Sequence, residues 1–326
     1  MKFEKPFDLI TILGPTACGK TRLAALLADR LDGEIISADS RQVYRRMDIG
    51  TGKDLDDYKV NGKTIPHHLI DIAEPGTEFN VFLYQQEFIR AYKEIKSRNK
   101  IPLLCGGSGF YLESILNRKM LVEVPQNNLL RETLKNKSLE ELVSILSGLK
   151  KLHSNTDSAD VSRAIRAIEI ETYIIENKKP EQNFPEIRSL IIGVNPGREF
   201  VRKNITQRLE TRLKAGMIGE VEKLLSEGIE PSCMMNYGLE YKFLTLYLKG
   251  QINYSDMFQQ LNTAIHQFAK RQMTWFRRME KKGFKILWLD GEMSEEKKLE
   301  LIITYIEAES KGDKKNSPEI AHGMDY

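Results

Sequence analysis

The chain has 326 residues, of which 41% are hydrophobic and 29% are charged, and its formal net charge is only +3. These values are typical of a globular protein with one large domain or two moderate ones, and no apolar run approaches the roughly 20 residues that span a bilayer, so we expect no membrane segment. Three widely separated cysteines show no CxxC spacing, so neither a disulfide framework nor a structural zinc site is implied. Because we find no export signal at the N-terminus, we expect a cytoplasmic protein.

Short apolar runs rich in β-branched residues recur along the chain and predict buried strands of a parallel sheet. These runs cover residues 9–13, 35–38, 101–105, 190–194 and 284–289. Longer segments with helical spacing lie between them, for example residues 22–31 and 82–96. The alternation predicts an α/β fold with a doubly wound parallel sheet.

The pattern changes between residues 119 and 185, where charged, helix-forming sequence replaces the strand-like runs. We interpret this segment as a mainly helical insertion domain. The core would then consist of residues 1–118 and 186–309, the latter including C-terminal helices. The polar stretch 310–326 lacks periodicity, and we expect it to be a disordered tail.

The first predicted strand runs directly into GPTACGKT, which matches G-x-x-x-x-G-K-[ST] at every fixed position and precedes a helix. In such a P-loop the backbone N–H groups and the positive end of the helix surround a phosphate group, and the lysine adds a full charge. The threonine hydroxyl would be offered to Mg²⁺. The residues predicted to bind phosphate groups are Gly14, Pro15, Thr16, Ala17, Cys18, Gly19, Lys20 and Thr21.

A phosphate loop does not identify the reaction, because nucleotide kinases, ATPases and GTPases all use one. A guanine reader of the Asn-Lys-x-Asp type is absent, and the run 101–105 leads into two glycines rather than into the acidic residue typical of an ATPase. Asp39 follows the second predicted strand, at the edge where open α/β sheets bind ligands. It would bind Mg²⁺ or accept a proton in a kinase-like reaction, or it would only cap the next helix.

Several segments together resemble the tRNA dimethylallyltransferases, also called tRNA isopentenyltransferases. The matching segments are GPTACGKT, SADSRQVYRRMDIGTGK, PHHLIDI, IPLLCGGSGFYL and AKRQMTWFRR, in this order. The resemblance implies that a dimethylallyl group is transferred from dimethylallyl diphosphate to N6 of an adenine next to the anticodon (position 37) of tRNA, with release of diphosphate from the phosphate loop. It also implies Mg²⁺ as cofactor and the anticodon stem-loop as partner. The lack of a eukaryotic-type zinc finger favours a bacterial-type enzyme, which we expect to be a monomer.

The resemblance assigns roles to individual residues. Asp39 would take a proton from the adenine amino group, while Lys20 and Arg208 would stabilise the charge on the departing diphosphate. The adenine must leave its stack to reach them, and a glutamine can read an adenine edge. The residues predicted to bind tRNA are Asp39, Ser40, Arg41, Gln42, Ser108, Arg163, Arg166, Lys270, Arg271 and Arg277.

Other interpretations of the same residues stay open. Gln42 would be an ordinary exposed helix residue, and the basic stretches 198–214 and 266–285 would be solvated helix faces. Trp275 and Phe276 are expected to pack in the core rather than to stack on bases. For the whole chain, the alternatives are an ATP-dependent small-molecule kinase and an RNA-binding protein without catalytic activity.

The chain also departs from the family pattern at four places. TDSAD at 156–160 replaces a usual His-Pro-Asn-Asp run, Asn204 and His266 replace common arginines, and NYGLEYK at 236–242 is an altered G-x-x-Y-[KR] element. These places belong to the parts expected to face tRNA or to rim the diphosphate site. They therefore bear on tRNA choice and affinity more than on the reaction.

Overall fold

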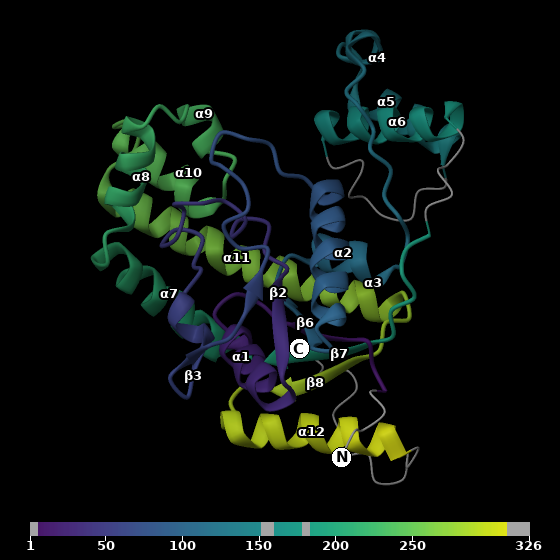
Figure 1. Ribbon diagram of the computed structural model, residues 1–326. Coiled ribbons are helices and arrows are strands. Elements are labelled where there is room, and N and C mark those ends of the chain that lie inside the picture. Colours follow the sequence, from purple (N-terminus) through teal and green to yellow (C-terminus); the bar gives the residue numbers. More distant parts are fainter. Residues whose placement is uncertain (1–5, 151–159, 178–182, 312–326) are drawn as a thin grey trace. The chain divides into compact units, whose positions relative to one another are not determined.

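The computed structural model describes residues 6–150, 160–177 and 183–311, and the chain divides into two units (Figure 1). One unit comprises residues 1–118 and 185–326 and carries the sheet, and the other comprises residues 119–184. Of the altered TDSAD run, only Asp160 lies within the described residues.

A six-stranded, all-parallel sheet forms the centre of the first unit, in the order β5-β2-β6-β1-β7-β8. Its strands are β1 (Leu9–Leu13), β2 (Gly33–Ser37), β5 (His67–His68), β6 (Ile101–Gly106), β7 (Ser189–Asn195) and β8 (Ile286–Asp290). All predicted strands are confirmed, with ends that differ by at most two residues. The edge strand β5 was not predicted, because it is a pair of histidines without an apolar run. A separate antiparallel pair joins β3 (Lys59–Val60) to β4 (Lys63–Thr64).

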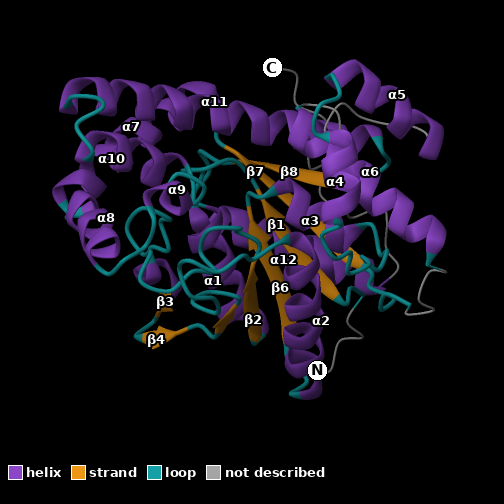
Figure 2. Cartoon of the chain, turned by 90° about the horizontal axis from the view of Figure 1, so that it is seen from above, coloured by secondary structure: helices purple, strands orange, loops and turns teal. Residues whose placement is uncertain are grey.

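Helices cover both faces of the sheet, so the predicted doubly wound α/β class is confirmed (Figures 1 and 2). Strand residues that alternate along the chain, such as Ile10 in β1, pack with α1 and α12 residues such as Ile302 in one core. On the opposite face, the Trp288 ring of β8 lies 6.3 Å from the Phe276 ring of α11. The covering helices are α1 (Lys20–Leu31), α2 (Val81–Ser97), α3 (Gly109–Leu116), α11 (Tyr254–Lys281) and α12 (Glu295–Lys311).

A second hydrophobic core lies among the later helices of this unit. Its helices are α7 (Arg198–Lys214), α8 (Met217–Ser226), α9 (Pro231–Met234) and α10 (Leu239–Leu248), together with part of α11. Val43, Tyr44 and Met47, from the chain after β2, are buried in the same core. A short 3₁₀ helix, η1 (Leu55–Tyr58), follows in that chain segment. The segment that carries Asp39 is therefore anchored on helices that lie far later in the sequence.

The end of the chain differs in one respect from the prediction. Helix α12 continues through Lys311, so Ser310 and Lys311 are helical and the predicted start of the tail is two residues too early. Leucine and isoleucine residues of this helix pack against the sheet, which extends the helix beyond the point where the sequence becomes polar. Residues 312–326 lie outside the described part of the chain.

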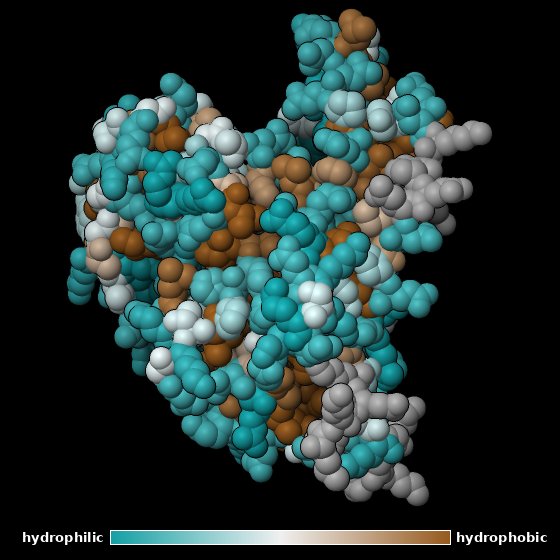
Figure 3. Space-filling model, in the orientation of Figure 1, coloured by the Kyte–Doolittle hydropathy of each residue, from teal (hydrophilic) through white to brown (hydrophobic). Residues whose placement is uncertain are grey.

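Within the described ranges, no helix is both long and apolar enough to cross a membrane. On the face seen in Figure 3, hydrophilic side chains predominate, and hydrophobic ones form separate patches between them.

The second unit is a small helical body, and its described residues contain no strand. Its helices are α4 (Asn128–Leu134), α5 (Leu139–Leu149) and α6 (Val161–Glu176). Each begins at a capping side chain: Asn127 accepts from the Leu130 N–H, Ser138 forms a capping box with Glu141, and Asp160 accepts from the N–H of residue 163. Apolar residues of all three helices pack in one core.

A buried carboxylate joins α4 to α6 in this unit. Glu169 is 2% exposed, and it accepts hydrogen bonds from Arg131 at 2.9 and 3.0 Å, from the Asn127 N–H at 2.5 Å, and from Arg166. Burial raises the pKa of Glu169, but these hydrogen bonds outweigh it and lower the pKa from 4.5 to about 2. The ionised carboxylate therefore stabilises the unit above pH 4.5, and this contribution is lost as the pH falls toward 2.

The substitution Glu169→Gln is expected to lower the stability of the helical unit at pH 7 by about 3 kcal/mol. The neutral amide cannot make the interactions that stabilise the ionised carboxylate and lower its pKa. Near pH 2 the difference from the wild type should vanish. Hydrogen exchange of the α6 amides in the full-length protein measures both values. Glu140→Gln, at an exposed position of α5, is the matched control, and equal protection of wild type and Glu169→Gln at pH 7 contradicts the prediction.

Candidate functional site

The loop between β1 and α1 has the shape of an anion cradle. Ala17 and Gly19 have positive φ angles of 61° and 83°, and α1 begins directly afterwards at Lys20. Lys20 Nζ lies 3.3 Å from the carbonyl oxygen of Pro15, which keeps its charge folded over the loop. Thr21 follows in the first turn of the helix. Backbone N–H groups, the positive end of α1 and an ammonium group therefore lie together.

Cys18 takes part in this loop only through its backbone. Its side chain is 4% exposed and packs in the core between the sheet and α1. Its side chain is therefore directed into the core.

The chain after β2 places Asp39 at the same carboxyl edge of the sheet, because all strands are parallel. Asp39 is partly buried, and its Oδ1 accepts a hydrogen bond from the Arg41 N–H at 2.9 Å. Residues 40–43 form turns rather than a helix, so the alternative in which Asp39 only caps a helix is wrong. The carboxylate retains further lone pairs that a substrate N–H group can use.

Gln42 is partly buried in this turn, so its interpretation as an exposed helix residue is also wrong. Its Oε1 accepts from Ser37 Oγ at 3.0 Å, and its Nε2 donates to the carbonyl oxygen of Gly52 at 3.0 Å. One N–H and one lone pair of the amide are left by these two bonds. The orientation of the amide is thus set by the protein itself.

Ser108 connects the loop after β6 to the loop after β2. Its Oγ accepts a hydrogen bond from the Ser40 N–H at 3.2 Å. The predicted residues Asp39, Ser40 and Ser108 are therefore brought together at one edge of the sheet.

Arg208 extends from α7 toward the phosphate loop. Its Nη1 lies 3.5 Å from Thr16 Oγ1, and its Nη2 donates to the Gly52 carbonyl oxygen at 3.4 Å and to the carboxylate of Asp54. Arg212, one turn later, donates to the same carboxylate at 3.1 and 3.2 Å. The structure thus brings Arg208 to the predicted diphosphate site, with Arg212 beside it.

Asp54 was not predicted from the sequence. Burial raises the pKa of its carboxyl group, but Arg208 and Arg212 outweigh this effect and lower the pKa overall. The ionised Asp54 therefore holds both guanidinium groups in place. It directly follows a segment that matches the family, but its two partners lie 154 and 158 residues later in the chain, and no local pattern shows that contact.

A buried ammonium group organises the irregular chain between β2 and α2. Lys53 is 1% exposed, and its Nζ contacts Asp48 Oδ1 and Asp71 Oδ1 at 2.5 Å each and the Tyr44 carbonyl oxygen at 2.8 Å. These contacts join the segments MDIGTGK and PHHLIDI. Both segments therefore have a structural role in holding the chain that leads from Asp39 to Asp54.

A carboxylate from α8 holds the same segment from the other side. Glu220 accepts hydrogen bonds from the N–H groups of Asp48 and Ile49 at 2.8 Å and of Gly50 at 3.0 Å. The Tyr241 hydroxyl, in the altered element NYGLEYK, donates to Glu220 at 2.6 Å. Burial raises the pKa of Tyr241, which keeps the hydroxyl protonated as a donor.

The two residues that stand in place of common family arginines, Asn204 and His266, make different contacts. Asn204 Nδ2 donates to the Ala17 carbonyl oxygen at 3.3 Å, so it still reaches the phosphate loop. His266 Nε2 lies 3.4 Å from Thr206 Oγ1. Burial and the charge of Arg202 lower the pKa of His266, so a neutral imidazole stands where the family commonly has a cation.

Helix α11 presents the other predicted RNA contacts. Lys270, Arg271 and Arg277 are exposed on it. Phe276 is fully buried, which confirms the core-packing interpretation for that residue. Trp275 is only partly buried, and the guanidinium of Arg278 lies 3.8 Å from the centre of its ring.

The two arginines predicted in the helical unit have different surroundings. The Arg163 side chain is 61% exposed and pairs with the capping Asp160 at 3.3 Å. Arg166 instead binds Glu169 and donates to the Val124 carbonyl oxygen at 2.8 Å. Arg166 therefore contributes to the fold of its unit, which its spacing from Arg163 did not reveal.

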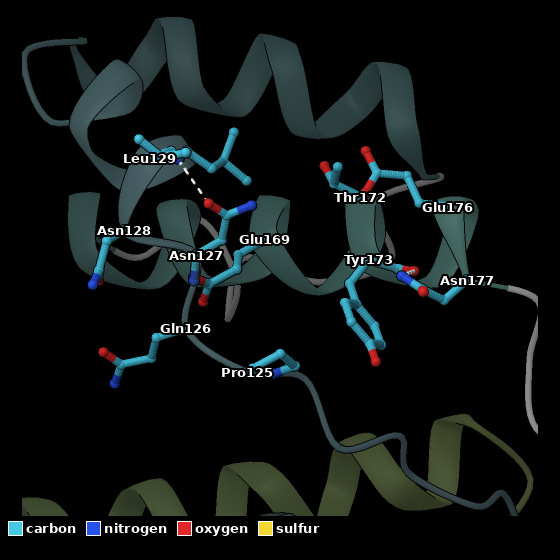
Figure 4. A pocket seen from close by; sticks show the side chains of 11 residues that line it. Pro125, Gln126, Asn127, Asn128, Leu129, Glu169, Thr172, Tyr173, Glu176 and Asn177 are labelled. Carbon is cyan, nitrogen blue, oxygen red and sulfur yellow. Dashed lines mark hydrogen bonds between the residues drawn. The ribbon is translucent and has the colours of Figure 1, made fainter.

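The helical unit also contains a pocket of about 440 Å³ (Figure 4). The segment 125–130 lines it from one side, and Thr172, Tyr173 and Glu176 of α6 line it from the other. Amides and carboxylates predominate among its lining residues, which include no lysine or arginine. It is therefore unsuited to hold a phosphate group, and it was not predicted from the sequence.

A parallel α/β core with a phosphate loop, an aspartate and arginines at one sheet edge is typical of P-loop enzymes that act on phosphorylated substrates. Residues 42–279 match the family model described as IPP transferase. The chain belongs to this family, which confirms the resemblance seen in its motifs.

Relatives and solved structures agree with this assignment. The chain is 57% identical over 296 residues to "tRNA dimethylallyltransferase 2" of Bacteroides fragilis, an alignment that covers 91% of this chain and 97% of the relative. It is 56% identical over 295 residues to "tRNA dimethylallyltransferase 1" of Parabacteroides distasonis, covering 90% and 96%. The structure of a tRNA isopentenylpyrophosphate transferase from Bacillus halodurans matches with a TM-score of 0.68 and 31% identity, covering 94% and 98%. A eukaryotic dimethylallyltransferase structure, 22% identical with a TM-score of 0.75 over 96% and 82%, shares the fold.

The substitution Gly52→Ala is expected to weaken binding of inorganic pyrophosphate at least tenfold. Gly52 has a φ of +65°, and a Cβ atom there would lie 1.8 Å from Arg212 Nη2 and 2.8 Å from Arg208 Nη2, so both guanidinium groups must move. Titration calorimetry measures the affinity. Gly62→Ala is the matched control. Gly62 has a φ of +75°, and a Cβ atom there would have no neighbour within 4 Å, so alanine introduces similar backbone strain without a steric clash. Equal affinities for the two variants contradict the prediction.

Proposed function

We propose that this protein transfers the dimethylallyl group of dimethylallyl diphosphate to N6 of the adenine next to the anticodon (position 37) of tRNA and releases diphosphate. The observation that carries this proposal is the arrangement of the phosphate loop, Arg208 and Asp39 along one edge of the sheet. A transferase needs a site for its leaving group beside a group that accepts a proton. The names of the bacterial relatives support the same reaction.

In the proposed reaction a bond forms between the adenine N6 and C1 of the dimethylallyl group, while the bond from C1 to the diphosphate oxygen breaks. The N6 lone pair is delocalised into the ring, so the amino group is a weak nucleophile. Asp39 would orient this group and accept its proton. The electron pair of the broken bond stays on the diphosphate, where the loop N–H groups, Lys20 and Arg208 would stabilise it.

The proposed RNA contacts fall into two groups. Ser40, Arg41 and Gln42 lie beside Asp39 and would receive the adenine after it leaves its stack, which costs a few kcal/mol. The exposed cations of α11 would bind phosphates and supply affinity rather than sequence choice. Arg163 would contribute in the same way from the helical unit.

Mg²⁺ fits this site as a cofactor held largely by the substrate. The described residues contain no group of three or more His, Cys, Asp or Glu side chains suited to hold a metal ion. Mg²⁺ commonly binds through few protein oxygens, several waters and substrate phosphates. The Thr21 hydroxyl would hold it, and the ion would neutralise charge on the diphosphate.

We also infer a cytoplasmic enzyme, because mature tRNA is a cytoplasmic substrate, and we propose that it acts as a monomer.

The substitution Asp39→Asn is expected to lower the rate of dimethylallyl transfer by about 10²- to 10⁴-fold, because the amide cannot accept the proton. Binding of the RNA and of pyrophosphate should change little. The assay follows a labelled dimethylallyl group from its diphosphate onto an anticodon stem-loop RNA. Asp56→Asn, whose side chain is 92% exposed, is the control. Phosphoryl transfer from ATP, or RNA binding without any transfer by the wild type, would contradict the proposed function.

Replacing Lys270, Arg271 and Arg277 together by glutamine is expected to make RNA binding less dependent on salt. Each lost phosphate contact should reduce the slope of log affinity against log salt by roughly 0.7. Affinity for the RNA stem-loop, measured by fluorescence anisotropy at several salt concentrations, gives this slope. A triple glutamine variant of the exposed Lys249, Lys297 and Lys311 has the same net charge and should retain the wild-type slope. Identical slopes in the two variants exclude the α11 surface as the phosphate contact.

A further inference from the structure

A series of hydrogen bonds and peptide links joins the phosphate loop to the loop that carries Asp39, and its central member is Gln272 of α11. Gln272 is 6% exposed. Its Oε1 accepts from the Thr16 N–H at 2.8 Å, and its Nε2 donates to the Gly107 carbonyl oxygen at 2.9 Å. The amide oxygen faces a donor and the amide nitrogen faces an acceptor, so a rotation that exchanged the two atoms would break both hydrogen bonds.

The series continues from Gly107 to the proposed base. Ser108 is the next residue, and its Oγ accepts from the Ser40 N–H at 3.2 Å. Ser40 in turn adjoins Asp39, whose carboxylate accepts from the Arg41 N–H. The leaving-group side and the proton-accepting side of the site are thus connected through one side-chain amide and one hydroxyl.

Packing around Gln272 leaves little room for adjustment. A Cβ atom on Gly107 would lie 2.3 Å from Gln272 Nε2 and 3.2 Å from the Gly14 carbonyl oxygen, so only glycine lets the loop after β6 come this close. The Thr16 N–H is directed at Gln272 and is therefore not available to an anion. Gln272 consequently links the Thr16 end of the phosphate loop to the loop after β6.

We propose that Gln272 is a positioning residue for the transfer reaction, an inference that rests on the proposed function. It would set the separation between the diphosphate and the adenine by holding the Thr16 N–H and the Gly107 carbonyl group at fixed positions. Bond formation at C1 requires N6 to approach on the side opposite the leaving oxygen, and a misplacement of about 1 Å can cost 10²-fold in rate. Gln272 acts through backbone groups and has no direct role in proton transfer.

The helix that carries Gln272 also carries the proposed RNA contacts. Lys270 and Arg271 directly precede it on the exposed side of α11. RNA bound to this helix would therefore be placed relative to the same amide that places the phosphate loop.

The test compares Gln272→Met with the wild type in single-turnover transfer. Methionine has a similar volume but makes neither hydrogen bond, and the rate constant at saturating substrates is expected to fall about 10²-fold. The affinities for pyrophosphate and for the stem-loop RNA should change less than about threefold, because the binding groups themselves remain. Gln260→Met, at an exposed position of the same helix, is the control and should match the wild type in rate and affinity.

A double-mutant cycle separates positioning from a general structural effect. Ser108→Ala removes another member of the same series, so its effect should be smaller in the Gln272→Met background than in the wild type. Three results would overturn the positioning role. The first is an unchanged rate constant in Gln272→Met, and the second is a loss of affinity without a loss of rate. The third is that the effects of the two substitutions on the rate multiply without any coupling.

Two further outcomes are decisive as well. If Gln272→Met does not fold, Gln272→Asn replaces it, because the asparagine side chain is shorter and its amide cannot reach the Thr16 N–H and the Gly107 carbonyl oxygen together. The same fall in rate at constant affinity is expected, and an unchanged rate overturns the role. A wild-type protein that forms no prenylated RNA overturns the proposed function and this inference with it, whereas an active wild type with an unchanged variant overturns the inference alone.

Discussion

The loops at the carboxyl edge of the sheet must be held by groups from outside the sheet, because the hydrogen-bond ladder of parallel strands ends where these loops begin. In this protein the later helices provide those groups. Gln272 from α11 binds the loops after β1 and β6, and Arg208 from α7 reaches Thr16 and Gly52. The motifs that identify the family lie mostly in the first third of the chain, but the site they form depends on helices from residue 198 onward.

In the segment between β2 and α2, which is largely irregular, charged side chains hold the backbone in place through hydrogen bonds and ion pairs. A buried charge is costly unless it is paired and hydrogen-bonded. Lys53 meets this condition with two carboxylates and a carbonyl oxygen. The partly buried Glu220 carboxylate accepts hydrogen bonds from three N–H groups and a hydroxyl. The long irregular segment can therefore adopt one conformation and present Asp39 at a defined place.

The electrostatics of the proposed diphosphate site depend on two arginines and several carboxyl groups. Asp54 pairs with both Arg208 and Arg212. The charges of both arginines also act on the carboxyl group of Glu240, and Arg208 acts on that of Asp57. The neutral His266 and the uncharged Asn204 reduce the charge at the rim relative to the usual family pattern. Asn204 still contacts the loop, so the replacement changes charge more than it changes packing.

The sequence by itself determined five of the six sheet strands, the phosphate loop, the position of Asp39 and the family, because each of these depends on residues that are consecutive in the chain. A buried parallel strand requires a continuous apolar run, and an anion cradle requires glycine, lysine and threonine at fixed neighbouring positions. Only the tertiary structure decided the contacts of Asp54, Arg166 and Gln272. Each has at least one partner remote in sequence, such as Thr16, which lies 256 residues from Gln272. A polar side chain has the same local pattern whether it faces water or is buried against such a partner, and the packing of the helices alone distinguishes the two.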